Sequence, residues 1–100
     1  MTPEAKVKKK VKMYLDKAGA YQFSPQSGIY GRSGIPDIVG CYKGGFFGIE
    51  CKAGDNKATA LQLSELAKIR NTGGVALLVN ETNVDEVMLQ FLGVSQGLII

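Results

Sequence analysis

The stretch that decides the fold of this 100-residue chain reads GIPDIVGCYKGGFFGIECK and occupies residues 34–52. Residues 37–42 and 46–52 are rich in β-formers, and the Lys-Gly-Gly turn at 43–45 separates them. Two short β-rich runs joined by a glycine turn are typical of a β-hairpin. We therefore predict two antiparallel strands here.

Chemically active side chains lie on one face of the second predicted strand. Side chains alternate between the two faces of a strand, so Glu50 and Lys52 share a face while Phe47, Ile49 and Cys51 point the other way. The three apolar residues are expected to face the core. A carboxylate and an ammonium then point at the same spot.

The sequence before the hairpin predicts a helix over roughly residues 3–18, with Thr2 and Pro3 as its start and Gly19 as its end. Its apolar residues recur at helical spacing, and they are Val7, Val11, Tyr14, Leu15 and Ala18. A short strand over 20–23 and a loop over 24–34 follow.

The sequence after the hairpin predicts helix, strand and helix. Thr59 and Gln62 have capping-box spacing before an amphipathic helix that Gly73 and Gly74 end. The apolar run 75–79 is consistent with a strand covered on both sides. A second capping box, Asn83 and Glu86, opens the last helix, which ends at Gly93. The order α-β-β-β-α-β-α indicates a single α/β domain over residues 1–100, with a mixed β-sheet flanked by helices.

Charge is distributed unevenly along the chain. The formal net charge is +3, but residues 1–17 contain six lysines and carry +4, which leaves −1 for the remainder. A lysine-rich helix of this kind either attracts a polyanion or is only a solvated surface, and the sequence leaves both interpretations open.

The cysteines and the hydropathy pattern exclude other classes. Cys41 and Cys51 lack the spacing of metal ligands, and the chain has no histidine, so we predict two buried free thiols. No signal peptide, lipidation motif or apolar run long enough to span a membrane is present. We expect an intracellular protein with no membrane association.

Asp37, Glu50 and Lys52 together suit phosphodiester hydrolysis. Two converging carboxylates can hold a hard cation such as Mg²⁺, which neutralises phosphate charge and acidifies a bound water. A lysine on the same face could position or deprotonate the attacking water. The structural alternative is a salt-bridged Glu50–Lys52 pair on an exposed strand, which would look the same in the sequence.

At these residues the chain resembles the PD-(D/E)xK nuclease superfamily, and within it the small VRR-NUC domains of phage and bacterial proteins and of larger DNA-repair nucleases. The resemblance covers most of the chain. It rests on residues 34–37 and 49–52, on Glu4 in the first helix and on Gln62 in the helix after the Glu-x-Lys strand. It implies a restriction-endonuclease-like core.

The resemblance also implies roles for particular residues. Asp37, Glu50 and the backbone carbonyl of Cys51 would bind Mg²⁺, for which Mn²⁺ would substitute, and Lys52 would be the catalytic lysine. Glu4 would supply a third carboxylate or contact a metal-bound water. Its alternative role is to stabilise the first turn of its helix as an acid near the positive end of the helix dipole.

Further residues are candidates for contact with nucleic acid. Gln62 would face the metal or the DNA backbone, and a role as capping-box partner of Thr59 does not exclude this. Arg32 and Ser33 in the loop could contact phosphate, as could Lys57, which is equally consistent with a solvated lysine. Tyr30 could stack on a base or pack against the domain.

The sequence therefore predicts a Mg²⁺-dependent DNA endonuclease. By the resemblance, it would act on branched DNA like a minimal Holliday-junction resolvase, as a homodimer in a phage or in the cytoplasm of a bacterial host. The apolar carboxyl end, 91–94 and 98–100, motivates the dimer. The alternatives are a non-cleaving nucleic-acid-binding module of a repair or replication complex, and a structural α/β protein that binds no nucleic acid.

Overall fold

The computed structural model describes residues 1–26 and 32–93, and its elements follow the predicted order. They are α1 (Pro3–Ala18), β1 (Tyr21–Phe23), β2 (Ile38–Tyr42), β3 (Gly45–Cys51), α2 (Ala60–Asn71), β4 (Val75–Val79) and α3 (Val84–Leu92). Tyr30, for which the sequence predicts stacking or packing, and Val94 and residues 98–100, which motivate the predicted dimer, lie outside the described residues.

The four strands form one sheet in the order β1-β2-β3-β4. β1 and β2, and β2 and β3, pair antiparallel, while β3 and β4 pair parallel, so the sheet is mixed as predicted. The hairpin turn places Lys43 and Gly44 at φ 51° and 83°. Left-handed backbone of this kind suits glycine, which explains the Lys-Gly-Gly turn.

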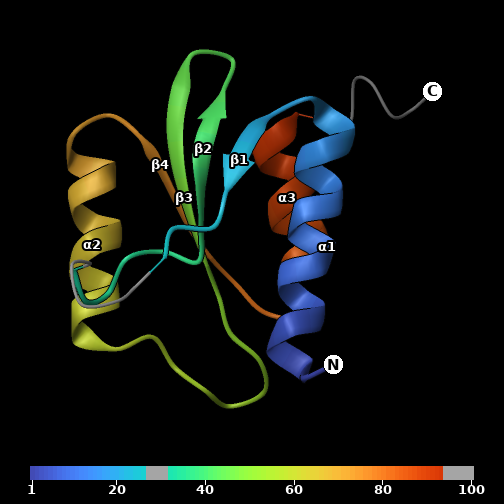
Figure 1. Ribbon diagram of the computed structural model, residues 1–100, viewed down its shortest axis with the longest axis vertical. Coiled ribbons are helices and arrows are strands. Elements are labelled where there is room, and N and C mark those ends of the chain that lie inside the picture. The colour runs from blue at the N-terminus through green and yellow to red at the C-terminus, as the bar shows by residue number, and fades with distance from the viewer. Residues whose placement is uncertain (27–31, 94–100) are drawn as a thin grey trace.

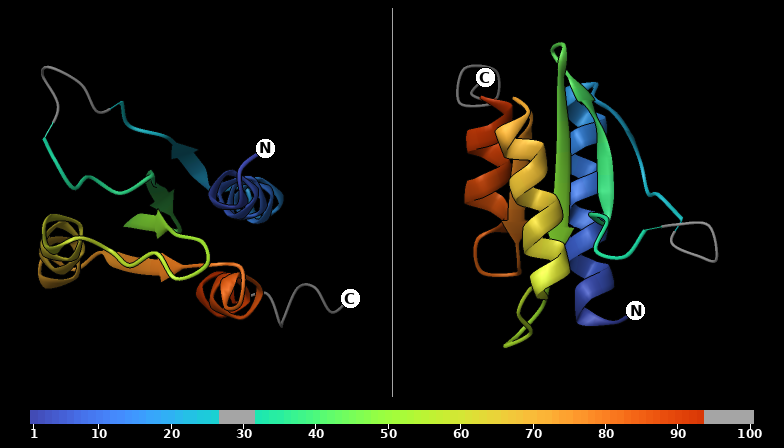
Figure 2. Two further views of the ribbon diagram at one scale, coloured as in Figure 1. Left: turned by 90° about the horizontal axis from the view of Figure 1, so that it is seen from below. Right: turned by 90° about the vertical axis from the view of Figure 1, so that its left-hand side faces the viewer.

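Helices cover the sheet from both sides. α1 and α3 pack together on one face, and α2 lies on the other (Figures 1 and 2). The core lies between the sheet and the α1–α3 pair, where burial of apolar side chains supplies most of the stabilisation. It consists of Val7, Val11, Leu15, Ile38, Phe47, Ile49, Cys51, Val79, Val84, Met88 and Leu92. The predicted inward face of the second hairpin strand is confirmed.

α2 covers only part of its face of the sheet. The backbone of Gly48 approaches the side chains of Ile69 and Pro36, where a Cβ would meet Ile69 at 2.6 Å. Toward the β1 edge this face is open, so Cys41 is exposed, and the prediction of two buried thiols is correct only for Cys51. The face is open here because α2 connects β3 to β4 and therefore lies over those two strands.

β4 is an edge strand, which corrects a second expectation. The run 75–79 was predicted to be covered on both sides, but Val75 and Leu78 are 38% and 39% exposed. Among the strands that the structure describes, only β3 pairs with β4. The continuous apolar run therefore belongs to an edge strand that its neighbours cover only in part. Leu78 is accessible to solvent on the face of the sheet that α2 packs against.

Two of the three predicted helix caps are confirmed. Thr2 accepts a hydrogen bond from the amide of Ala5, and Thr59 and Gln62 form the complete capping box. Asn83 begins α3 without a side-chain cap, because its Oδ1 accepts from the amide of Asn80 instead. Among the described helices, none is long and apolar enough to cross a membrane.

Candidate active site

The hairpin register brings Asp37 and Glu50 together. Ile38 pairs with Ile49, so the residues that flank this pair, Asp37 and Glu50, lie at the same end of the hairpin. Oδ2 of Asp37 accepts a hydrogen bond of 2.8 Å from the amide of Cys51. This bond holds the carboxylate beside β3.

Glu50 is a buried acid with an incomplete set of partners. The residue is 2% exposed, and its Oε2 lies 3.0 Å from Nε2 of Gln62 and 3.6 Å from Nζ of Lys52. Its Oε1 is buried and has no hydrogen-bond partner in the part of the chain that the structure describes. A buried polar atom without a partner destabilises the fold, and such atoms concentrate at functional sites.

The pKa of Glu50 is raised to about 7, first by burial and then by the neighbouring Asp37 carboxylate, while Lys52 opposes the shift. Burial disfavours the charged form of any acid, and a second negative charge adds to the effect. Both its burial and the neighbouring Asp37 carboxylate therefore disfavour the charged form of Glu50.

Gln62 has both of the roles that the sequence left open. Its Oε1 accepts from the amide of Thr59 at 2.8 Å, which completes the capping box, and its Nε2 donates to Glu50. Because the capping contact holds the amide in one orientation, the donor is directed at the carboxylate. The first turn of α2 thus positions Glu50.

Lys8 is a site residue that the sequence analysis missed. Its Nζ lies 3.4 Å from Oδ1 of Asp37. β1 ends at Phe23, which pairs with Val39, so the sheet edge next to Asp37 is not covered by β1 and α1 can reach it. A signal existed, because residues four apart share a helix face and Lys8 follows Glu4 by four.

Glu4 lies on the same side of the molecule but does not join the two carboxylates. It lines a separate cavity of about 320 Å³ with Gly54 and Glu81. Within residues 1–26 and 32–93, no three Asp, Glu or Cys side chains come close enough together to hold a metal ion. Its assignment as a third carboxylate therefore stays a prediction.

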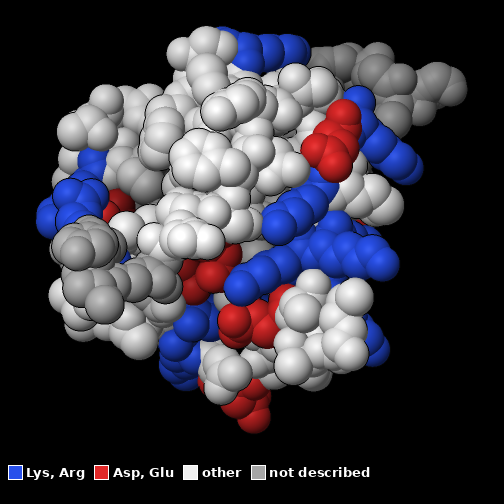
Figure 3. Space-filling model, viewed as in Figure 1, with Lys and Arg blue, Asp and Glu red and all other residues white. Residues whose placement is uncertain are grey.

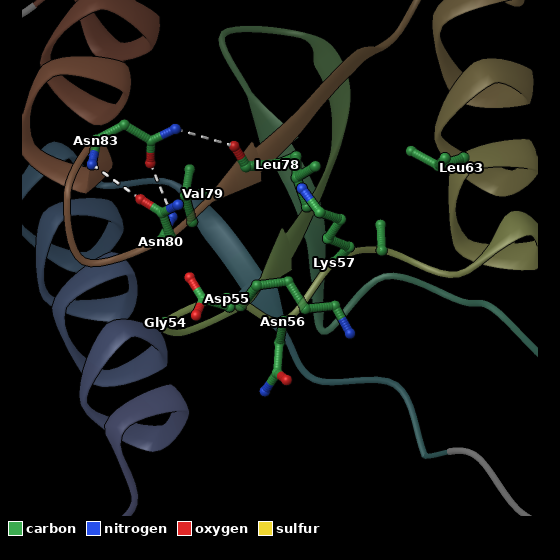
Figure 4. Close-up of a pocket in the computed structure, with 11 residues that line it drawn as sticks. Gly54, Asp55, Asn56, Lys57, Leu63, Leu78, Val79, Asn80 and Asn83 are labelled. Carbon is green, nitrogen blue, oxygen red and sulfur yellow. Dashed lines mark hydrogen bonds between the residues drawn. The ribbon is translucent and has the colours of Figure 1, made fainter.

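Of the other predicted contacts, Lys57 lies near the site, whereas Arg32 lines a different cavity beside the hairpin turn, at the opposite end of the hairpin from the two carboxylates. Arg32 is paired with the mostly buried Glu65 at 2.9 Å, although its own side chain is 72% exposed, and Ser33 next to it is exposed. Lys57 lines a cavity that Lys52 also lines (Figure 4). Lysines and arginines gather over α1, beside acidic side chains in the lower middle of the molecule (Figure 3).

The donor set at Asp37 and Glu50 fits a divalent cation. Hard cations prefer carboxylate oxygens, and the partnerless Oε1 of Glu50 is an oxygen that a cation would satisfy. A bound cation would also offset the repulsion between the two carboxylates that raises the Glu50 pKa.

Comparison with solved structures agrees with this architecture. A structure described as "VRR_NUC domain" superposes with a TM-score of 0.75 over 91% of this chain and 99% of that one, at 24% sequence identity. The chain has the VRR_NUC fold. No family model and no curated protein matches the sequence. The VRR_NUC fold accounts for the element order and the mixed four-stranded sheet, and it confirms at the level of the fold the resemblance noted from the sequence.

Proposed function

We propose that the chain is a metal-dependent nuclease that hydrolyses phosphodiester bonds in DNA. The observation that carries the proposal is the buried Glu50, which lies beside Asp37 and Lys52 and has one oxygen without a partner among the described residues. A purely structural Glu–Lys pair needs neither a second carboxylate nor an unsatisfied oxygen. The VRR_NUC fold supports the same conclusion.

Asp37, Glu50 and the carbonyl of Cys51 would hold Mg²⁺, or Mn²⁺ in its place. Such an ion neutralises phosphate charge and lowers the pKa of a bound water. The amide of Cys51 donates a hydrogen bond to Asp37, and the side-chain amide of Gln62 donates one to Glu50. Each bond fixes the position of its carboxylate. The residues thus supply a preorganised pair of carboxylates on β2 and β3.

In this proposal, Lys52 acts on the water and the phosphate. Its backbone amide donates to the carbonyl of Val79 at 2.9 Å, which anchors the end of β3, and its side chain is only 16% exposed. In the proposed step, Lys52 orients the attacking water, whose oxygen bonds to phosphorus as the water gives up a proton to solvent. The bond to the leaving oxygen breaks, and that oxygen takes a proton from solvent. Lys8, whose Nζ lies 3.4 Å from Asp37, would add a second positive charge for the scissile phosphate.

The finer proposal is that the substrate is branched DNA and that the chain acts as a homodimer. Two symmetric active sites suit a four-way junction, because opposing strands are related by a two-fold axis. Light scattering at micromolar concentration tests the dimer. A monomer that still cuts junctions with paired nicks would contradict it.

The deciding experiment incubates the protein with labelled four-way junction, flap, single-stranded and duplex DNA in Mg²⁺, Mn²⁺ or EDTA. We expect metal-dependent cutting of the junction. Asp37→Asn keeps an oxygen for the Cys51 amide yet removes the charge, so it should reduce cutting by at least about 100-fold while preserving or strengthening DNA binding. Lys52→Ala should also abolish cutting.

The control is Lys17→Ala, which removes an exposed lysine in the last turn of α1. It should cut like the wild type. If wild type and Lys52→Ala bind DNA alike and neither cuts any substrate with either metal, the nuclease proposal fails. The non-cleaving nucleic-acid-binding module would then be the better explanation.

A further inference from the structure

A cavity of about 590 Å³ opens next to Lys52 (Figure 4). Its walls come from the loop after β3, from α2, from the end of β4 and from the turn that leads into α3. Its volume falls within the range of about 300–1,000 Å³ that is usual for small-ligand sites. Of the residues proposed to act in catalysis or phosphate contact, Lys52 and Lys57 line this cavity, and its remaining walls have no part in that proposal.

Two exposed leucines line the cavity. Leu78 belongs to β4, pairs in register with Glu50 and is 39% exposed. Leu63 belongs to α2 and is 51% exposed. These two water-exposed leucines come from different elements and form one apolar surface in the cavity. A flat apolar group of a ligand could bind to this surface. The pairing of Leu78 with Glu50 places this surface one strand away from the proposed metal ligand, at about 4.8 Å between strands.

The polar part of the lining is of two kinds. Asn80 and Asn83 are held by each other and by the turn, since Oδ1 of Asn83 accepts from the amide of Asn80 and Oδ1 of Asn80 accepts from the amide of Thr82. They form a rigid wall. The other kind is charged: Lys52 and Lys57 add two positive charges and Asp55 one negative charge, which leaves an excess of one positive charge in the lining. Because Lys52 also pairs with Glu50 at 3.6 Å, Lys57 is the lysine that suits the phosphate of a ligand with an apolar face.

We propose that this cavity receives one unpaired nucleotide next to the scissile phosphate, with its base against Leu63 and Leu78 and its phosphate near Lys57. The inference rests on the proposed function. A base inside a duplex is stacked and paired, and taking it out costs free energy. Nucleotides at a branch point or flap are already unpaired, so a base-binding cavity beside the catalytic groups favours branched over linear DNA.

The test uses 2-aminopurine, whose fluorescence rises when the base leaves the stack. It is placed singly at each of the nucleotides that flank the branch point of flap DNA, and binding is measured in EDTA, so neither the probe position nor the measurement depends on cleavage. We expect a rise of at least about 3-fold at one position. Leu78→Ala and Leu63→Ala should lose most of this rise.

The same variants are compared in cleavage. Leu78→Ala should cut the flap about 5- to 20-fold more slowly than wild type, and Leu78→Ile should retain most of the activity. Leu89→Ala is the matched control, because Leu89 is 37% exposed on α3 and does not line the cavity. Circular dichroism and thermal melting verify that each variant is folded.

The outcomes separate the inference from the nuclease proposal. If wild type cuts DNA but Leu78→Ala behaves like Leu89→Ala in fluorescence and cleavage, the cavity does not bind a base and only the inference fails. If the fluorescence rises and depends on Leu78 while no metal supports cutting, the cavity binds a nucleotide and the nuclease proposal fails. If Leu78→Ala instead turns a dimer into a monomer, the cavity is an interface between copies and the inference is overturned.

Discussion

At the scale of single residues, the site is organised around a destabilising acid. Glu50 has a raised pKa, about 7, because the fold buries it next to Asp37. The folded state therefore binds a proton more tightly than the unfolded chain, in which the pKa is near 4.5. The resulting stability is fully present below pH 4.5 and is lost as the pH rises through 7.

Glu50→Gln should therefore stabilise the metal-free protein at pH 8, by about 2–3 kcal/mol, and have little effect at pH 4.5. The neutral amide keeps the shape of the side chain without the buried charge. Urea denaturation at the two pH values measures the free energy of unfolding, with exposed Glu86→Gln as the control. Equal stability of Glu50→Gln and wild type at pH 8 would contradict the prediction.

Lys8 gives a second prediction at this scale. Its ammonium lies 3.4 Å from Asp37 and so repels a cation bound to that carboxylate. Lys8→Met removes the charge and should tighten Mn²⁺ binding about 3- to 10-fold, as measured by titration calorimetry. Lys9→Met, which changes the neighbouring exposed lysine, should leave the affinity near that of wild type. Weaker Mn²⁺ binding in Lys8→Met would refute this role.

At the scale of elements, close backbone contacts position the hairpin. A Cβ on Gly40 in β2 would overlap the carbonyl oxygen of Tyr21 in β1 and come within 2.8 Å of the ring of Phe47. The carbonyl oxygen of Tyr21 is a backbone atom, so rotating a side chain cannot relieve this overlap. β1 and β2 can therefore pair only if residue 40 has no side chain.

Gly40→Ala should destabilise the fold by about 3 kcal/mol and disrupt the pairing of β1 with β2. Gly45→Ala is the matched control in the same hairpin, since a Cβ there meets only the Tyr42 carbonyl at an ordinary 3.7 Å. Urea denaturation of the two variants provides the measurement. A loss in Gly40→Ala no larger than in Gly45→Ala would show that the sheet can shift to make room.

At the scale of the whole molecule, the basic amino-terminal segment lies beside the acidic site. Glu4, Lys8 and Lys12 follow one another at four-residue spacing on α1, and Lys8 reaches Asp37. These three residues lie in a row along one face of α1, and Lys8 is the member of the row that contacts the site. Of the two interpretations of the lysine-rich helix, the placement of Lys8 favours attraction of a polyanion.

This placement predicts the salt dependence of DNA binding. The logarithm of the affinity should fall linearly with the logarithm of the salt concentration, by about 0.9 for each phosphate neutralised. Lys12→Gln should reduce the steepness by about 1, whereas Lys43→Gln at the hairpin turn should not change it. Fluorescence anisotropy in EDTA at several salt concentrations gives the slopes, and identical slopes for all three proteins would exclude Lys12 from the interface.

The sequence by itself determined the elements and the paired motifs. Turn glycines, helix caps and alternation along strands are local properties, so the order of elements and the shared face of Glu50 and Lys52 could be predicted, and the structure confirms both. The same local signals predicted that Phe47, Ile49 and Cys51 face the core, which is correct.

Only the tertiary structure decided which surfaces are covered and which distant side chains meet. The exposure of Cys41 and Leu78 depends on where α2 crosses the sheet, which no local pattern encodes. The contact of Lys8 with Asp37 depends on the short β1, which leaves the sheet edge open to α1. Such contacts join residues far apart in the chain, and their geometry follows from the packing of whole elements.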